Sequence, residues 1–223
     1  MYSQKKDPKL EINISSGIQF NRGKINNSNF EKIRKTHLPF YQFGLCFSNR
    51  ITPKKRFSIN LDFNSGKLVR DFNYEVSDSV GKFQYKSKYY YNFISYGFGI
   101  QYRYKIKNKA EFLSGIGYYT LSTQNYGEKY HWDNGTGSNI SYLREIQSND
   151  FTKNNKFVQI RLGLNLKLLK SEKNTLTILF NTTLMRPLYG SSYFDVNKIK
   201  VEESSYKINY SNISIGYTRI IKL

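Results

Sequence analysis

The sequence contains few of the residues that cross-link, break or anchor other folds. Its 223 residues include one cysteine, Cys46, two histidines and four prolines. A single cysteine excludes an internal disulfide framework and a zinc site built on cysteine pairs, so we expect Cys46 to be a small interior residue and expect no metal or other cofactor. No apolar run reaches the about 18–20 residues of a membrane-spanning helix. This absence excludes a helical membrane protein.

The composition is poor in hydrophobic residues but rich in aromatic ones. Hydrophobic residues make up 39% of the chain, and aromatic residues 17%, with 20 Tyr and 16 Phe. Disordered chains are poor in aromatics, so disorder is excluded. The formal net charge of +19 first suggests nucleic acid, but no basic helix or recognised nucleic-acid motif accompanies it. Phosphates of anionic lipid headgroups or lipopolysaccharide explain the charge equally well, and we predict no nucleic-acid partner.

Residues 157–168, FVQIRLGLNLKL, carry the clearest pattern in the chain. Every second residue from Val158 to Leu168 is aliphatic, and the positions between them include Arg161 and Lys167. Because successive side chains of a strand point to opposite faces, this period of two predicts a β-strand with one polar and one apolar face.

The same alternation recurs in eight stretches. The predicted strands are residues 10–20, 40–49, 57–64, 90–104, 110–121, 157–168, 175–185 and 206–223. Between the first two, Ser28 and Glu31 have the spacing of a capping box and predict a short helix that ends before Pro39.

The connections between these strands alternate in length. Long connections follow the first, third, fifth and seventh strands, and short ones follow the others. A transmembrane barrel explains this alternation, because its turns are short on one side of the membrane and its loops long on the other. Residues 65–89 alternate along both of their arms and predict a tall hairpin, whereas 123–155 and 187–205 are predicted to be loops.

The fold class that follows is all-β: a single domain, 1–223, with residues 1–9 as a periplasmic tail. We predict an eight-stranded antiparallel up-and-down transmembrane β-barrel with a polar, plugged lumen and long extracellular loops. Closure removes the unpaired strand edges that lipid does not tolerate.

The apolar parity is predicted to face lipid and the polar parity the lumen. The lumen of an eight-stranded barrel is only wide enough to be filled by side chains, too narrow for all the large apolar side chains of this sequence. The polar parity carries a predicted lumen charge network of Glu11, Asp62, Arg103, Glu111, Arg161 and Lys167. Charges packed there are expected to pair, because an unpaired buried charge is costly. Arg219 has lipid-facing parity and is expected at the periplasmic interface, where it can snorkel.

At this point the chain resembles the small eight-stranded outer-membrane barrels of Gram-negative bacteria, of the OmpA-transmembrane-domain, OmpX and OmpW type. Its final residues, SIGYTRIIKL, are similar to the C-terminal assembly signal of such barrels, with Leu223 in place of the usual aromatic. The composition, rich in Tyr, Asn and Lys, is similar to that of Bacteroidota outer-membrane barrels, including PorT-like ones. The resemblance implies the cell outer membrane. Since MYSQKK lacks an apolar segment, we expect a signal peptide to have been removed.

Two sets of residues are candidates for contact with other molecules. Basic turns at the membrane interface are predicted to meet anionic headgroups or a membrane or periplasmic subunit; they contain Arg50, Lys54, Lys55, Arg56, Lys105, Lys107 and Lys109. Some barrels of the resembled kind modify lipid A with a histidine and a carboxylate at the outer rim. His131 and Asp133 are the candidates for such a site here.

We predict a non-enzymatic structural or interaction subunit of the outer membrane, surrounded by lipid and lipopolysaccharide, that presents its extracellular loops or its outer wall to a larger complex. One alternative is a lipid A-modifying hydrolase that uses His131. Another is a soluble basic β-barrel that binds nucleic acid or an apolar ligand.

Overall fold

The structure is a computed structural model made almost entirely of β-strands. It describes residues 8–26, 31–33, 38–78, 81–107, 109–123, 127–133, 139–145, 155–168, 173–196 and 199–222. These residues contain no helix that is long and apolar enough to cross a membrane.

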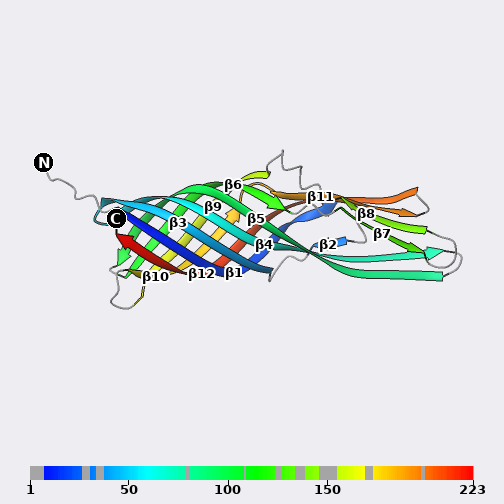
Figure 1. The fold of residues 1–223 in the computed structure, drawn as a ribbon, viewed down its shortest axis with the longest axis horizontal. Coiled ribbons are helices and arrows are strands. Elements are labelled where there is room, and N and C mark those ends of the chain that lie inside the picture. Colours follow the sequence, from blue (N-terminus) through cyan, green and yellow to red (C-terminus); the bar gives the residue numbers. More distant parts are fainter. Residues whose placement is uncertain are drawn as a thin grey trace.

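Eight of the strands close into a barrel, as predicted. The described residues form twelve strands in all: β1 (Lys9–Asn26), β2 (Glu31–Ile33), β3 (Leu38–Thr52), β4 (Lys55–Asp78), β5 (Gly81–Lys107), β6 (Ala110–Thr123), β7 (Gly127–Asp133), β8 (Asn139–Glu145), β9 (Asn155–Lys167), β10 (Asn174–Thr183), β11 (Leu188–Val196) and β12 (Ile199–Lys222). Around the barrel the order is β1-β3-β4-β5-β6-β9-β10-β12, and antiparallel pairing of β1 with β12 closes the cylinder (Figure 1). The barrel therefore has no open edge, which a membrane requires.

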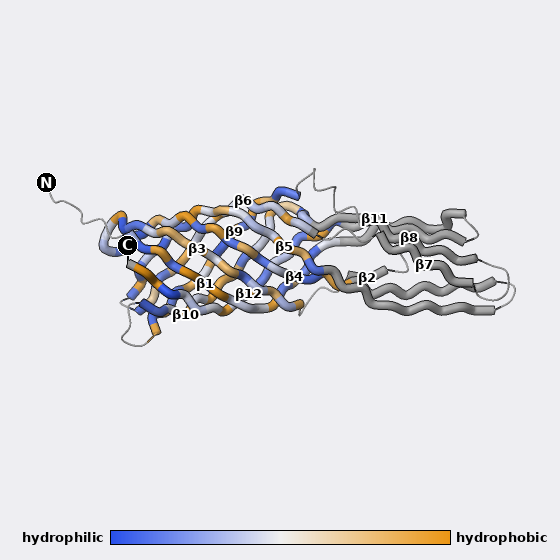
Figure 2. Tube along the Cα trace, viewed as in Figure 1, coloured by the Kyte–Doolittle hydropathy of each residue, from blue (hydrophilic) through white to orange (hydrophobic). Residues whose placement is uncertain are grey.

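The apolar parity faces outward, as predicted. On β4, Phe63 is 52% exposed, whereas its neighbours Asp62 and Asn64 are 2% and 1% exposed. Hydrophilic and hydrophobic residues alternate along much of the barrel wall (Figure 2). An outer wall of exposed aliphatic and aromatic side chains cannot face water stably, so lipid covers it and the soluble alternative is wrong.

The barrel has a turn end and a loop end. At the turn end, short connections join β3 to β4, β5 to β6 and β9 to β10, and Lys9 pairs with Lys222 where the barrel begins and ends. The exposed side chains of Tyr102 and Tyr104 lie there, at one border of the membrane band. Arg219 is also exposed near this end, and its Nη1 donates a hydrogen bond to Asn174 Oδ1 at 2.8 Å.

At the loop end the strands continue well beyond the apolar wall. The β4–β5 ladder runs without a break from Lys55 and Tyr104 to Asp78 and Gly81, which confirms the tall hairpin. A strand needs only about 9–11 residues to cross the bilayer. The outer half of this hairpin therefore stands clear of the membrane, and β7, β8 and β11 lie at the same end of the molecule (Figure 1).

Two of the predicted loops contain strands. The loop predicted at 123–155 includes β7 and β8, and the one at 187–205 includes β11 and the start of β12. β11 pairs with β12 and with β8, and β8 pairs with β7. The sequence prediction was wrong here because these short strands are stabilised by the edge that β12 offers, a tertiary partner that local composition does not reveal.

The predicted short helix before Pro39 is also wrong for the part of it that is described. Residues Glu31–Ile33 form β2, which pairs with residues 70–72 of β4, and Pro39 lies within β3. The capping-box residue Ser28 lies outside the described residues. The free edge of β4 supplies backbone partners, and such tertiary pairing overrides a weak local helix signal.

A charge placed on the outer wall tests which surface faces lipid. We expect Ile100→Arg, in the middle of β5, to lower the free energy of unfolding by about 2–4 kcal/mol, because arginine at the bilayer midplane loses its hydration. Ile106→Arg, outward on the same strand at the turn end, is the matched control and is expected to cost about 0–1 kcal/mol. Urea titration in lipid vesicles, with the faster-running unboiled band on a denaturing gel as the folded signal, measures both. Equal costs would contradict the assignment.

Candidate functional site

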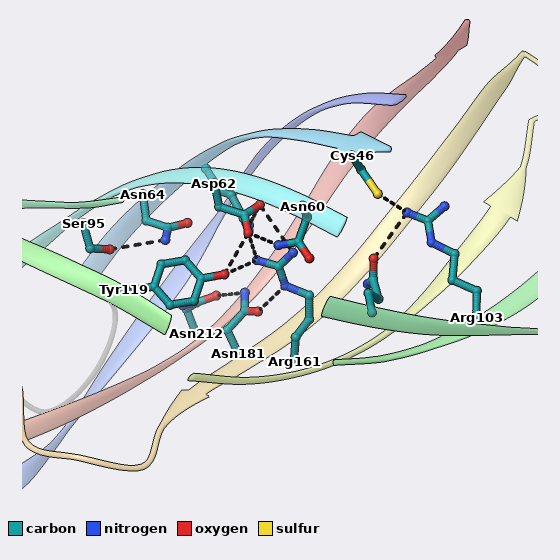
Figure 3. A network of polar contacts seen from close by, with 12 residues as sticks. Cys46, Asn60, Asp62, Asn64, Ser95, Arg103, Tyr119, Arg161, Asn181 and Asn212 are labelled. Carbon is teal, nitrogen blue, oxygen red and sulfur yellow. Dashed lines mark hydrogen bonds and ion pairs between the residues drawn. The ribbon is translucent and has the colours of Figure 1, made fainter. Parts of the chain in front are cut away.

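The inside of the barrel is filled by side chains that form two charge networks and an aromatic cluster. Asp62 on β4 and Arg161 on β9 meet at the centre. Arg161 Nη2 donates to Asp62 Oδ2 at 2.8 Å, and Nη1 donates to Oδ1 at 3.3 Å. The Tyr119 hydroxyl donates to Oδ2 at 2.8 Å, Gln42 Nε2 donates to Oδ1 at 3.1 Å, and Asn60 donates to the same carboxylate (Figure 3). A desolvated ion pair needs such additional hydrogen bonds to be stable.

The central network continues along the wall, from β9 through β10 to the closing strand β12. Arg161 Nε donates to Asn181 Oδ1 at 3.0 Å, and Asn181 Nδ2 donates to Asn212 Oδ1 at 3.0 Å. The chain of contacts therefore runs from Asp62 on β4 through β9 and β10 to β12 (Figure 3). The Asp62–Arg161 contact joins two strands that do not pair directly, whereas the asparagine contacts link the paired strands β9, β10 and β12.

Two glycines make room for the Tyr119 ring. A Cβ added to Gly117 would lie 2.5 Å from Tyr119 Cε2, and one added to Gly97 would lie 2.7 Å from Tyr119 Cδ1. Both distances are too short for carbon atoms that are not bonded. The glycines of the polar parity are thus part of the network, since they let the tyrosine lie flat on the wall and reach Asp62.

A second network lies nearer the turn end. Arg103 Nη1 donates to Glu11 Oε2 at 2.5 Å, and both side chains are nearly fully buried. The hydroxyl of Ser48 donates to Glu11 Oε1 at 3.0 Å. Arg103 Nη2 donates to Cys46 Sγ at 3.0 Å and to Gln101 Oε1 at 3.3 Å. Cys46 is buried, and its sulfur is an acceptor within this network.

An aromatic cluster closes the lumen at the loop end. The ring of Phe157 stacks on Tyr119 with centroids 5.5 Å apart and meets Tyr210 edge-on at 6.0 Å. Phe93 packs on the other side of Tyr210 at 5.1 Å. Phe40, Phe93, Phe157 and Tyr210 are between 0% and 1% exposed, so buried rings close the top of the lumen, with Gln19 and Asn21 buried beside them.

The sequence analysis missed this aromatic cluster, although a signal for it exists. Each strand that runs from the loop end to the turn end has an aromatic residue on its polar parity two positions before a buried polar residue. These residues are Phe40 on β3, Phe93 on β5, Phe157 on β9 and Tyr210 on β12. The lumen is therefore polar over most of its length but apolar at the loop end.

The structure separates the six predicted lumen charges into two groups. Glu11, Asp62, Arg103 and Arg161 are buried and form the two ion pairs. Glu111 and Lys167 are half-buried and line the opening of the barrel at the turn end instead.

The predicted basic turns also divide. Arg50, Arg56 and Lys105 line the opening of the barrel at the turn end. The remaining four are exposed and do not line it; they are Lys54, Lys55, Lys107 and Lys109. A register shift between Lys105 and Lys107 breaks the alternation of side chains along β5.

The predicted rim residues lie on β7, in the part of the molecule beyond the barrel (Figure 1). The side chains of His131 and Asp133 lie outside the described residues. Within the described residues, no group of three or more His, Cys, Asp and Glu side chains could hold a metal ion.

No protein-family model matches this sequence, and no curated protein matches it. Solved structures do. The chain is similar to the outer membrane protein OprG from Pseudomonas aeruginosa, with 11% identity, 98% of each chain covered and a TM-score of 0.54. It is similar to the outer membrane protease OmpT from Escherichia coli, with 8% identity, 96% of this chain and 97% of that one covered, and a TM-score of 0.48.

A third similar structure is Ail, the attachment invasion locus protein of Yersinia pestis, with 10% identity, coverages of 94% and 98%, and a TM-score of 0.39. At these identities the likeness concerns the fold alone, and we use the OprG match for it. The finer resemblance to Bacteroidota PorT-like barrels stays a prediction. The closed barrel, its apolar outer wall and its likeness to OprG give this chain the fold of the small eight-stranded outer-membrane β-barrels, and its place is the cell outer membrane.

Proposed function

We propose that this chain is a non-enzymatic interaction subunit of the outer membrane. Its filled barrel is a rigid base, and the extension at the loop end is the surface that a partner binds. The observation that carries this proposal is the unbroken ladder between β4 and β5. Hydrogen-bonded strands that continue far beyond the membrane band form a built surface, which a simple membrane anchor does not need.

The filled interior argues against transport of solutes through the barrel. Between the two charge networks the free space is about 30 Å³, room for about one water molecule. The central ion pair lines this space, and the aromatic cluster lies beyond it toward the loop end. A solute would have to break the Asp62–Arg161 pair and displace buried rings to cross, so the proposal assigns the barrel no conducting role.

The extension offers a chemically suitable binding edge. Residues 81–92 of β5 pair with β4, whereas pairing of β5 with β6 starts at Phe93. Among the described residues, this segment therefore has no strand on its second side. An unpaired edge presents backbone donors and acceptors to an extended segment of another protein.

Photo-crosslinking in intact cells tests the proposal. It also distinguishes a partner that binds the hairpin from one that binds the lipid-facing wall. A photoreactive residue at position 84 samples the hairpin, and one at position 98 samples the lipid-facing wall. We expect protein crosslinks at 84 and lipid crosslinks at 98. Protein crosslinks at 98 alone would favour a complex assembled through the outer wall, and lipid at both positions would contradict an interaction role.

A trimmed barrel is the matched control. Replacing residues 69–90 with Asn-Gly joins Leu68 to Tyr91, which are directly paired, through a two-residue turn. We expect this variant to keep its heat-modifiable band and to lose the partner.

For the alternative lipid A hydrolase, His131→Ala is the test. An unchanged acyl pattern of lipid A by mass spectrometry rejects the enzyme, and a changed pattern contradicts our proposal.

A further inference from the structure

The turn end of the barrel contains a pocket that the proposed function does not use. Its volume is about 260 Å³, and residues from all eight barrel strands line it. Six cationic side chains surround it: Lys9, Arg50, Arg56, Arg103, Lys105 and Lys167. Glu11 and Glu111 are the carboxylates among its lining residues. The lining therefore carries an excess of four positive charges.

Three of these cations form a row across neighbouring strands. Arg50 on β3 is the direct partner of Arg56 on β4, which is in turn the direct partner of Arg103 on β5. Like charges directly opposite each other destabilise a sheet. Glu11 pairs with Arg103 at the inner end of the row. A row of this kind is stabilised when an anion lies against it, since guanidinium groups match the oxygens of a phosphate.

The pocket is blind, which distinguishes a binding site from a channel entrance. Its inner wall is the Glu11–Arg103 pair, and the next free space inside is about 30 Å³. The Nε of Arg103 is buried without a hydrogen-bond partner. The pocket is smaller than the about 300–1,000 Å³ of drug-sized ligand sites, so it suits a small anion.

We propose that this pocket binds a phosphate-bearing anion at the periplasmic mouth of the barrel. The phosphate belongs either to a free anion of the pyrophosphate type or to a phospholipid headgroup of the inner leaflet that bends into the mouth. In both cases Arg50 and Arg56 contact the phosphate oxygens, and Lys9, Lys105 and Lys167 supply the surrounding field. The site is at the opposite end from the proposed partner surface and does not depend on it.

Two double variants of the β3–β4 turn test the site. Arg50→Gln/Arg56→Gln removes two charges that line the pocket, and Lys54→Gln/Lys55→Gln removes two charges of the same turn that do not line it. Pyrophosphate binding to the barrel in uncharged detergent is measured by calorimetry. Phosphatidylglycerol retained from mixed bilayers is measured by native mass spectrometry. The heat-modifiable band shows that each variant is closed.

We expect the arginine variant to lose roughly tenfold or more in affinity, because it loses charge-assisted hydrogen bonds. The lysine variant is expected to change less than about twofold, because its side chains do not line the pocket and act on the ligand only through solvent, where salt screens them. A loss confined to calorimetry identifies the free anion as ligand, and a loss confined to retained phosphatidylglycerol identifies the headgroup. No binding in either experiment, or equal losses in the two variants, would overturn the proposal.

Discussion

Asp62→Ala is expected to lower the free energy of unfolding by about 3–5 kcal/mol, because it leaves a buried arginine without its counter-ion. Arg161 donates two hydrogen bonds to this carboxylate, and the hydroxyl of Tyr119 donates a third. All of these donors keep their buried position when the acceptor is gone. Urea titration followed by the heat-modifiable band measures the loss.

A double-mutant cycle separates the ion pair from the loss of packing. Asp62→Ala/Arg161→Ala removes both charges, so we expect it to be less destabilised than the sum of the single variants, with a coupling of about 0.5–3 kcal/mol. Gly44 lies beside Asp62, since a Cβ there would be 2.8 Å from Asp62 Oδ1. Gly44 is left unchanged in all of these variants. Additive single costs would show that the two side chains do not interact and would contradict the central network.

Phe157→Ala is expected to cost about 3–5 kcal/mol, as for other large aromatic side chains removed from a core. The ring is fully buried and contacts both Tyr119 and Tyr210, so its loss leaves a cavity in the seal at the loop end. The same urea titration measures this cost, and the unboiled band shows whether the barrel still closes.

Phe157→Leu is the control, because it keeps an apolar side chain of similar size and is expected to cost less than about 1.5 kcal/mol. The aromatic cluster and the central network share Tyr119. We therefore expect Phe157→Ala and Asp62→Ala to be non-additive when combined. If Phe157→Ala cost no more than Phe157→Leu, the ring would not fill a closed core and the seal at the loop end would be wrong.

The interior and the two ends of the barrel have different roles. The central network and the aromatic cluster keep the barrel closed and rigid. They thereby hold the binding surfaces at the two ends in place. Rigid elements position binding groups better than loops do. The loop end offers an extended sheet edge, and the turn end offers a cationic pocket. The two proposals concern opposite compartments and are tested by independent variants.

The sequence by itself determined the strands of the barrel and the face that each turns to lipid. Both follow from a period of two residues, which a strand imposes on its own side chains without help from the rest of the chain. The alternation of Phe57, Ile59 and Leu61 with polar residues was sufficient to place β4. Burial of four of the six predicted lumen charges also followed, because a narrow barrel has no other place for them away from its ends.

Only the tertiary structure decided which groups meet. Asp62 and Arg161 are 99 residues apart, and Glu11 and Arg103 are 92 apart, so their pairing depends on the register of every strand between them. The same holds for the rings of Phe93, Phe157 and Tyr210, which lie on three strands. The strands within the long connections form only because other strands offer an edge for them to pair with. Which residues of the basic turns line the opening depends on how the barrel closes. These features depend on contacts between distant segments, and no local period encodes them.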